Sequence, residues 1–411
     1  MKRVMFACSG EIQNDTLSCG SWIEAIALGL RSSFEIVFLA RTPDDSGVTH
    51  RSVRVGGVPF SVHFAGAAPI PELVHSAVQM ERPDVVVIFG TESDASHRFT
   101  DAMEQEGLLD HTVAFAQGFA SIWAKHFTEG LPERVVRRNT VRDLIRRDGL
   151  RAQVRNFERR GEREIAMLKK VKHYIGRTEF DYAVLRLANP DCAYYKCSDV
   201  MRPAFYERQW TYGACVPHSI FVSQYYYPVK GFHYLLEAAS YLKPKYPDLS
   251  IVAAGYNPIR KSFAQREWKD SSYIRYLKTL ACRYGLQDCI HPIGPQSAEE
   301  MAKQYCLANV YAMPSTIENS PNSLAEAMLL GVPSVAADVG GVAELAAYGK
   351  EARVYPSSAP YLLAYHIDRV FADPKAAEQL GRNGRARALI EYDRETNWNA
   401  LKHAFSAIAE A

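Results

Sequence analysis

Two glutamates in the C-terminal half of this 411-residue chain have the types and spacing to bind a hydroxyl-bearing anion. Glu318 lies in a polar stretch, and Glu326 follows eight positions later. Between them, near Asn322, a predicted helix begins, and its first N–H groups lack intrahelical partners and carry about half a positive charge. Helical side chains lean toward the N-terminus, so we expect Glu326 to point back toward Glu318. Amides that attract phosphate, beside acids that accept from hydroxyls, suit a nucleotide sugar.

A compact strand–helix–strand unit must position these groups. The apolar residues 310–313 predict a buried strand, and Ser320 and Pro321 predict a helix start, as N-cap and first helical residue. Gly331 is typical of a helix end, and residues 333–337 predict the next strand. We expect the two strands to be parallel, with a right-handed crossover.

Composition excludes several classes of protein. A net charge of +2 gives no case for nucleic-acid binding, and the length predicts about two to three domains. The eight cysteines include no C-x-x-C pair, which favours reduced thiols in a cytosolic protein over disulfides or a zinc site. The apolar run after Met1 is too short for a signal peptide, and no run reaches the roughly 18 to 20 apolar residues of a membrane span.

The order of motifs in residues 313–344 resembles the donor-binding signature of the family 4 retaining glycosyltransferases. The resemblance rests on Pro-Ser before Glu318, Glu-Ala-Met at Glu326, Gly-x-Pro after the helix, and Gly-Gly-x-x-Glu beyond it. It implies the α/β GT-B fold, in which two Rossmann-like domains face each other across a cleft. The strand–loop–helix rhythm of residues 4–39 independently indicates a doubly wound α/β domain. We expect an acceptor domain at 1–206, a donor domain at 207–392, and a final helix at 393–411 that crosses back.

The resemblance also implies roles for particular residues. Glu326 would hold the ribose hydroxyls, and Glu318 would contact the donor sugar or act as a nucleophile. Lys230, next to Gly231 at a helix start, is a suitable point charge for the diphosphate. Relatives seat the nucleobase against backbone at the turn after Ile293. The remaining positions expected to line the donor are Gly20, Pro295, Asn319, Ser320, Asn322, Ser323 and Leu324.

The chain departs from the family pattern at two places. In the family an arginine usually joins the lysine on the diphosphate, but Ser223 and Gln224 occupy that region here. Arg260 and Lys261 are candidates for the second charge, and the sequence leaves open which group supplies it. Many relatives carry a histidine that contacts the transferred sugar where this chain has Gln117. Gln117 would then be a neutral hydrogen-bonding substitute, and His97, after a buried strand, is a second candidate for that contact. A surface or capping role for His97 is the alternative, and His126 is a weaker candidate.

Residues 131–172 contain 14 Lys or Arg against 6 Asp or Glu, with apolar positions that suggest helices. Such a segment suits an anionic membrane surface or an anionic lipid-linked acceptor, and it is equally compatible with a solvated helical face.

Residues 177–181 resemble a short motif of a polysaccharide-associated branch of the family, which also tends to carry the Glu-Asn-Ser-Pro-Asn-Ser of the donor loop.

The sequence thus predicts a retaining hexosyltransferase in polysaccharide or glycoconjugate assembly. Its donor would be a nucleotide-diphosphate sugar, UDP favoured over GDP, and its acceptor a glycan or lipid-linked glycan. We expect no cofactor and no metal, because no Asp-x-Asp site follows a strand. The protein would be cytoplasmic, or peripheral at the inner face of the cell membrane. The alternatives are a nucleotide-sugar epimerase or hydrolase on the same fold, and a catalytically degenerate partner subunit.

Overall fold

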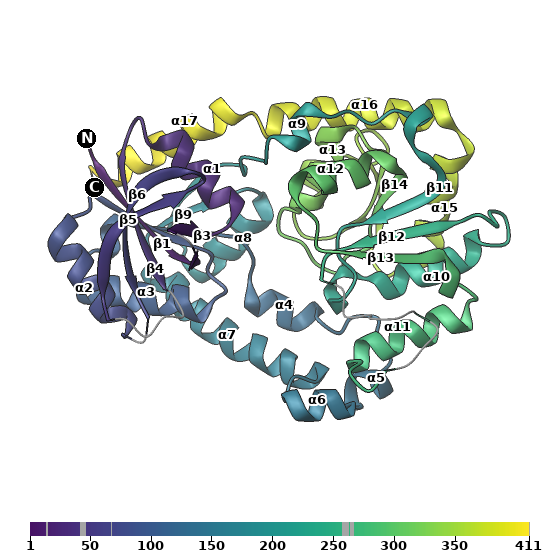
Figure 1. Ribbon diagram of the computed structural model, residues 1–411, viewed down its shortest axis with the longest axis horizontal. Helices are drawn as coiled ribbons and strands as arrows, with labels where there is room; N and C mark the ends of the chain where they lie inside the picture. The colour runs from purple at the N-terminus through teal and green to yellow at the C-terminus, as the bar shows by residue number, and fades with distance from the viewer. Residues whose placement is uncertain (14, 42–46, 67, 257–262, 264–266, 411) are drawn as a thin grey trace. The chain divides into compact units, whose positions relative to one another are not determined.

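The computed structural model describes residues 1–13, 15–41, 47–66, 68–256, 263 and 267–410 (Figure 1). The chain divides into two compact units. Unit 1 consists of residues 1–121, 159–202 and 392–411, and unit 2 consists of residues 122–158 and 203–391. The division falls inside two helices, α4 (Ala120–His126) and α7 (Leu150–Lys170).

Residues 122–158 group with unit 2, although we expected them in the N-terminal domain. Hydrogen bonds explain this grouping. Thr140 Oγ1 donates to the Asp270 carbonyl at 2.9 Å, and the Asp143 carboxylate accepts from the Ser272 amide at 2.9 Å. These contacts join segments 130 residues apart, so local sequence patterns gave no sign of them.

Unit 1 is built on a mostly parallel sheet. In the described residues the strand order is β10-β9-β8-β7-β1-β4-β6-β5-β3-β2. The central strand β1 pairs in parallel with β4 and β7, and Val4 and Phe6 are fully buried, as expected for a sheet covered on both faces. The strands are β1 (Arg3–Ser9), β2 (Glu11–Gln13), β3 (Thr16–Ser18), β4 (Glu35–Arg41), β5 (Thr49–Val55), β6 (Val58–Ala65), β7 (Val85–Phe89), β8 (Thr112–Phe115), β9 (His173–Gly176) and β10 (Ala193–Lys196).

Helices complete unit 1. Besides the 3-10 helix η1 (Leu109–His111), they are α1 (Ser21–Leu30), α2 (Ile70–Glu81), α3 (Asp94–Gln105), α8 (Glu179–Ala188) and α17 (Arg394–Ile408). The chain's last helix, α17, packs into the unit 1 core: Phe405 lies edge-on to Phe6 and Phe34, with ring centroids 6.4 and 5.8 Å apart.

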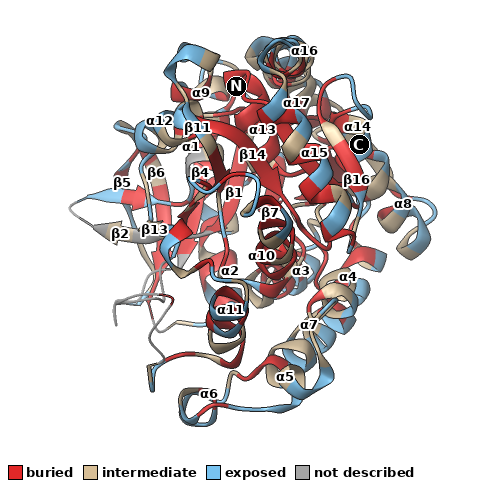
Figure 2. Ribbon diagram, turned by 90° about the vertical axis from the view of Figure 1, so that its right-hand side faces the viewer, coloured by how far each residue is buried: buried red, intermediate tan, exposed pale blue. Residues whose placement is uncertain are grey.

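The sheet of unit 2 is parallel throughout its described residues, with the order β13-β12-β11-β14-β15-β16. Every residue of β14 is buried, and Figure 2 shows the strands near it as largely buried. The strands are β11 (Val216–Val222), β12 (Ser250–Ala254), β13 (Ile290–Gly294), β14 (Ala308–Met313), β15 (Ser334–Asp338) and β16 (Arg353–Pro356).

The helices of unit 2 include one correction to the sequence analysis. Helix α13 (Asn322–Leu330) begins one residue later than expected, with Pro321 and not Ser320 as its N-cap. Pro321 has an extended ψ of 105°, so it cannot be the first helical residue. The other helices are α5 (Glu133–Arg137), α6 (Val141–Arg146), α9 (Ala204–Glu207), α10 (Phe232–Leu242), α11 (Ser272–Arg283), α12 (Ala298–Leu307), α14 (Val342–Leu345), α15 (Pro360–Ala372) and α16 (Pro374–Glu391), with 3-10 helices η2 (Tyr212–Ala214), η3 (Pro228–Lys230) and η4 (Gln287–Cys289).

Across the part of the chain that is described, no helix combines the length and apolar character needed to cross a membrane.

Candidate functional site

Lys230 and Glu318 form an ion pair beyond two neighbouring strands of unit 2. Lys230 ends η3, which follows β11, and Glu318 lies in the loop after β14. Lys230 Nζ lies 2.6 Å from Glu318 Oε1, and Ser315 Oγ donates to the same oxygen at 2.7 Å. Because β11 and β14 are parallel neighbours, the loops that follow them meet at one edge of the sheet, where open α/β sheets bind ligands.

The pair is partly accessible to a ligand. The lysine side chain is 28% exposed, whereas the glutamate side chain is only 12% exposed. An ammonium group has three N–H donors, so the bond to Glu318 leaves donors on Lys230 for an anion. The carboxylate is held by two donors at once, which fixes its orientation.

Two glycines hold the loop of Glu318 in place. Gly231 has a left-handed φ of +65°, and a Cβ on it would lie 1.7 Å from the Pro314 carbonyl oxygen. Gly340, with a φ of +54°, approaches Glu318 in the same way, since its Cβ would lie 1.8 Å from the Glu318 carbonyl oxygen. The Thr316 amide also donates to the Val229 carbonyl at 2.8 Å. Only glycine tolerates both the φ and the approach, so these two positions set where Glu318 lies.

Glu326 lies on α13, where it is 8% exposed. Tyr305 Oη lies 3.3 Å from Glu326 Oε2 and 2.9 Å from the Ser323 carbonyl oxygen, and both are acceptors. The Tyr305 ring contacts the ring of Tyr311, with centroids 5.2 Å apart. Burial raises the pKa of Tyr311, and the negative charges of Glu318 and Glu326 raise it further. Glu326 is thus linked to Tyr311 through Tyr305.

Tyr305, Tyr311 and Ser315 are residues of this site that the sequence analysis missed. The tyrosines read as ordinary core positions, because each lies on the buried side of a regular element. Ser315 stands three positions before Glu318. This spacing allows a hydroxyl to bond a loop carboxylate, so it could have predicted the contact from the sequence.

The start of α13 offers backbone donors beside the acids. The Leu324 amide donates to the Pro321 carbonyl at 3.0 Å, so the amides of Asn322 and Ser323 are the ones left over by helix geometry. Asn322 Oδ1 is buried without a hydrogen-bond partner among the described residues. Asn319 and Ser320, in the same loop, are buried. The positive end of the helix and its amides suit an anion.

The expected nucleobase turn is bound by a side chain of the protein. Gln296 Nε2 donates to the carbonyls of Ile293 at 2.8 Å and Pro295 at 3.0 Å. Both carbonyls therefore already accept a hydrogen bond from a side chain of the same turn. Of the expected diphosphate ligands, Arg260 and Lys261 lie outside the described residues.

Gly20 and His97, two of the three residues of unit 1 that we expected to contact donor or sugar, lie at or on helices α1 and α3. Gly20, the N-cap of α1, has a φ of +101°. His97 is buried on α3, and burial lowers its pKa, so the neutral ring donates from Nε2 to the Thr91 carbonyl at 2.8 Å. Its Nδ1 has no hydrogen-bond partner in the part of the chain described.

Gln117 follows β8, and its position is fixed by a buried arginine. Arg177 Nη2 donates to the carbonyls of Ala116 and Gln117 at 3.2 and 3.1 Å, while Nη1 pairs with Asp199 at 2.8 Å. The Arg177 amide donates to Asp181 at 2.9 Å. The 177–181 motif thus anchors the end of β8. Gln117 Nε2 is buried and lacks a hydrogen-bond partner among the described residues.

Segment 131–172 contains basic residues that bond within the protein and a short helix with exposed apolar residues. Several on the C-terminal half of α7 and just beyond it bond to neighbours in unit 1: Arg160 to the Glu92 carbonyl, Arg163 to Asp94, Lys170 to Asp101 and Glu104, and Lys172 to Asp110. Helix α6 differs, since Val141, Leu144 and Ile145 are exposed by 61, 62 and 69%.

Comparison with known proteins shows what the chain resembles. Residues 217–387 match the family model "Glycosyl transferases group 1". The D-inositol 3-phosphate glycosyltransferase of Corynebacterium urealyticum is 28% identical over 174 residues, which are 40% of this chain and 39% of that relative. Among solved structures, sucrose-phosphate synthase from Thermosynechococcus elongatus superimposes with a TM-score of 0.72 at 18% identity and covers 99% of both chains. Alr3699/HepE of Anabaena, in complex with UDP and glucose, gives 0.68 at 16% identity, covering 99% of this chain and 100% of that one.

The family match covers β11 to α16 and includes Lys230, Gly231, Glu318 and Glu326. The structural likeness extends over the whole chain and confirms the GT-B fold that the sequence predicted. Residues 217–387 are therefore similar to the group 1 glycosyltransferases, the chain spans less than half the length of the curated relatives it matches, and its fold is that of GT-B structures.

Proposed function

We propose that this protein is a retaining glycosyltransferase that moves a hexose-type sugar from a nucleotide-diphosphate sugar to a glycan or lipid-linked acceptor. The observation that carries the proposal is the Lys230–Glu318 ion pair, held at 2.6 Å in the unit whose helix α13 also carries Glu326. The match to the group 1 glycosyltransferases over these residues supports it. A UDP-sugar donor is favoured because a structural neighbour of similar fold binds UDP and glucose.

Lys230 is proposed to carry most of the charge stabilisation. Sugar transfer develops negative charge on the leaving phosphate, and a prepositioned cation at that charge lowers the barrier. The Asn322 and Ser323 amides would add two donors at the positive end of α13. With this neutralisation, transfer is expected to proceed without a metal ion, so chelation by EDTA should leave the rate unchanged.

Glu326 is proposed to accept from the ribose hydroxyls, and Glu318 from hydroxyls of the donor sugar. Glu318 is already bonded to Lys230 and Ser315 through one oxygen, which lowers its nucleophilicity. This favours a same-face displacement over a double displacement through a glycosyl–Glu318 intermediate. In that step the acceptor oxygen bonds the anomeric carbon, the bond to the phosphate oxygen breaks, and the leaving phosphate takes the acceptor's proton.

A thermal-shift screen with UDP-, GDP- and ADP-sugars identifies the donor, since a ligand that binds only the folded form raises Tm. With that donor, Lys230→Ala and Glu318→Ala should each lower turnover by about 10² to 10³ while the protein stays folded. Lys245→Ala is the matched control, because Lys245 also pairs with a carboxylate, Asp368, at 2.5 Å in the same unit. Near-normal turnover in Lys230→Ala or Glu318→Ala would contradict the assigned role.

Product analysis separates this proposal from its alternatives. A transferase releases glycosylated acceptor only when acceptor is present. An epimerase or hydrolase converts the donor fully without acceptor, and a degenerate subunit converts nothing.

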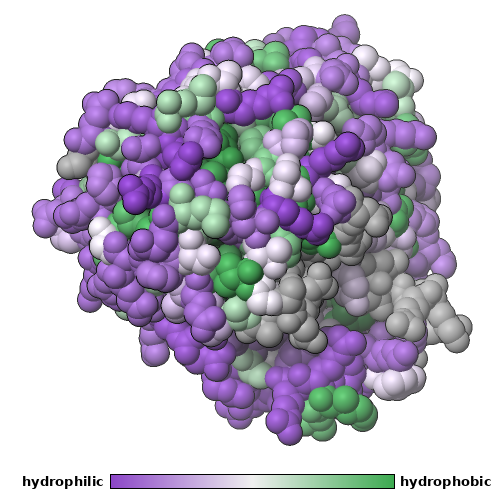
Figure 3. Space-filling model, turned by 60° about the vertical axis from the view of Figure 1, so that its left-hand side comes forward, coloured by the Kyte–Doolittle hydropathy of each residue, from purple (hydrophilic) through white to green (hydrophobic). Residues whose placement is uncertain are grey.

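We also propose that α6 docks on an anionic membrane surface, where a lipid-linked acceptor would be found. Its exposed Val141, Leu144 and Ile145 lie beside Arg146 and Arg147, which is the pattern of an interfacial helix. Figure 3 shows that apolar side chains form small separate patches on one mostly hydrophilic face of the molecule. The basic residues of the last turns of α7 are less suited, because they bond within the protein.

Vesicle flotation at low salt tests the membrane proposal. Replacing Val141, Leu144 and Ile145 together by Ser should abolish binding to vesicles that contain anionic lipid. Leu187→Ser is the control, because Leu187 is 88% exposed on α8 and stands outside the basic segment. Binding that survives the triple substitution would remove the proposal.

A further inference from the structure

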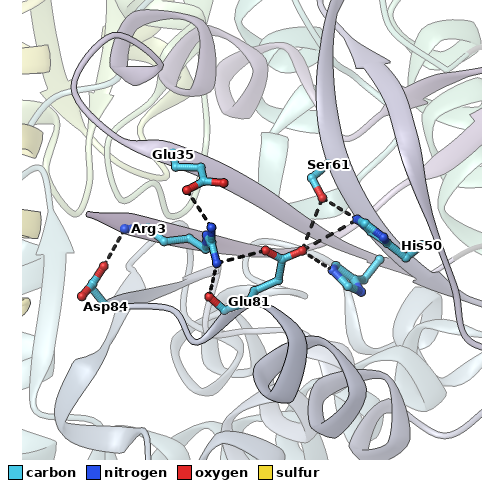
Figure 4. Close-up of polar contacts among 7 residues, drawn as sticks. Arg3, Glu35, His50, Ser61, Glu81 and Asp84 are labelled. Carbon is cyan, nitrogen blue, oxygen red and sulfur yellow. Dashed lines mark hydrogen bonds and ion pairs between the residues drawn. The ribbon is translucent and has the colours of Figure 1, made fainter. Parts of the chain in front are cut away.

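Two histidines of unit 1 face each other across a hairpin that the proposed chemistry does not use. Strands β5 and β6 are antiparallel, and their register places His50 directly opposite His63. Opposed residues of such a pair project from the same face of the sheet. The two imidazole rings are stacked, with centroids 4.2 Å apart and planes 19° apart (Figure 4).

Figure 4 shows the carboxylate of Glu81, the last residue of α2, directed toward His50. Its Oε1 atom lies 2.7 Å from His63 Nε2 and 3.7 Å from His50 Nε2. Ser61 Oγ completes the group, 2.7 Å from His50 Nε2 and 3.5 Å from Glu81 Oε1. His63 is 1% exposed, whereas the His50 side chain is 39% exposed, so the cluster is buried on one side and open on the other.

The surroundings orient Glu81 and leave the cluster negative. Arg3 Nη1 lies 3.4 Å from Glu81 Oε2 and also donates to the Glu81 carbonyl, which turns Oε1 toward the histidines. Arg3 itself pairs with Glu35 at 2.8 Å, and its backbone amide donates to Asp84 at 2.6 Å. One cation and three carboxylates give two net negative charges when both histidines are neutral.

We propose that His50, His63 and Glu81 form a binding site for a divalent transition-metal ion, and that Zn²⁺ suits it best. The three ligand atoms lie within 4.8 Å of one another. A tetrahedral zinc with bonds of about 2.0 to 2.1 Å separates its ligand atoms by about 3.3 Å, a value between the two observed Nε2–Oε1 distances. Two imidazoles and a carboxylate are ligands that zinc accepts, and the exposed side of His50 leaves a fourth position for water.

Binding requires changes at both histidines. Each must hold its proton on Nδ1 so that Nε2 can bind the ion, which places the His63 proton on a buried nitrogen that has no partner among the described residues. The metal must also replace the contacts of His63 with Glu81 and of His50 with Ser61. The ion's two positive charges would balance the two negative charges of the cluster. It would then join the β5–β6 hairpin to the end of α2, so its main effect is expected on the stability of unit 1. The site contains no residue of the donor-binding group, and its test is independent of transfer activity.

Zinc and cobalt binding to the EDTA-stripped full-length protein tests the proposal. Competition with a chromophoric chelator should reveal one Zn²⁺ per chain at this site, and added Zn²⁺ should raise Tm. His50→Gln and Glu81→Gln should each weaken binding by more than about tenfold, since loss of even an outer-shell partner costs that much. His75→Gln is the matched control, because His75 is an exposed α2 histidine that bonds one carboxylate, Glu106, at 2.9 Å.

Cobalt distinguishes this cluster from the chain's free cysteines, including the exposed Cys282. A site of imidazole and carboxylate ligands gives visible d–d bands without the intense near-ultraviolet charge-transfer band of a thiolate. Tight binding that is lost in His50→Gln and Glu81→Gln and kept in His75→Gln supports the site. The absence of binding, a thiolate spectrum, or equal affinity in His50→Gln and the wild type would overturn it.

Discussion

Gly231→Ala keeps every proposed catalytic side chain in the sequence, but it shifts the backbone that carries them. The new Cβ would lie 1.7 Å from the Pro314 carbonyl oxygen. Real Cβ contacts stay beyond 3.0 Å, so the two backbones must separate by at least 1.3 Å, the difference between these values. Lys230 immediately precedes Gly231, and Glu318 follows Pro314 by four residues, so the separation opens their 2.6 Å contact.

The expected cost has two parts. A misplacement of about 1 Å in a catalytic group lowers turnover about 10²-fold, and we expect at least that loss. The left-handed φ of +65° adds about 1 to 2 kcal/mol of instability for alanine. Gly285→Ala isolates the second part, because Gly285 has a φ of +66° and a Cβ on it would meet nothing within 4 Å.

Steady-state rates with the identified donor, together with urea unfolding, separate the two parts. Both variants should lose similar stability from the φ strain, and Gly231→Ala should lose more from the clash. Only Gly231→Ala should lose turnover. Wild-type turnover in Gly231→Ala would refute the claim that this close approach sets the distance between Lys230 and Glu318.

Two further predictions concern buried charges of unit 1. Burial raises the pKa of Glu164 from 4.5 to about 7, so the native state binds one more proton than the unfolded state between these values. The contribution of Glu164 to stability is therefore full below pH 4.5 and is lost as pH rises through 7, by about 3 kcal/mol in all. Glu164→Gln keeps hydrogen-bond partners for Thr91 and Ser121 and should remove this pH dependence. Urea unfolding at pH 5 and pH 8 measures it, and an unchanged difference in unfolding free energy between the two pH values would contradict the prediction. Arg177→Met leaves Asp199 buried without its charge partner and should cost about 3 to 5 kcal/mol, whereas Arg177→Met with Asp199→Leu should recover part of the loss. Equal instability of the single and double variants would show that the ion pair is not the cause.

The sequence predicted the parallel strands and the helix of residues 310–337, because apolar runs and the residues that start and end helices are local signals. It placed the start of α13 one residue early, because Pro321 is compatible with either the N-cap or the first turn until its ψ is known. The glycine contacts of Gly231 and Gly340 join segments far apart in the chain, so no local pattern contains them.

The β5–β6 hairpin was absent from the sequence interpretation, although a signal was present. Gly56 and Gly57 both have positive φ, and they separate two strands along which polar and apolar residues tend to alternate. This pattern is typical of a two-residue hairpin turn. Recognising that turn fixes the register and places His50 opposite His63. The approach of Glu81 could not have been predicted, because it depends on how α2 packs against the sheet.

The measurement that tests the central claim most directly is a crystal structure of the protein with UDP. We predict the diphosphate within hydrogen-bonding distance of Lys230 Nζ and of the Asn322 and Ser323 amides, with the ribose hydroxyls on Glu326. A diphosphate bound elsewhere, with Lys230 still directed only at Glu318, would contradict the assignment of this site.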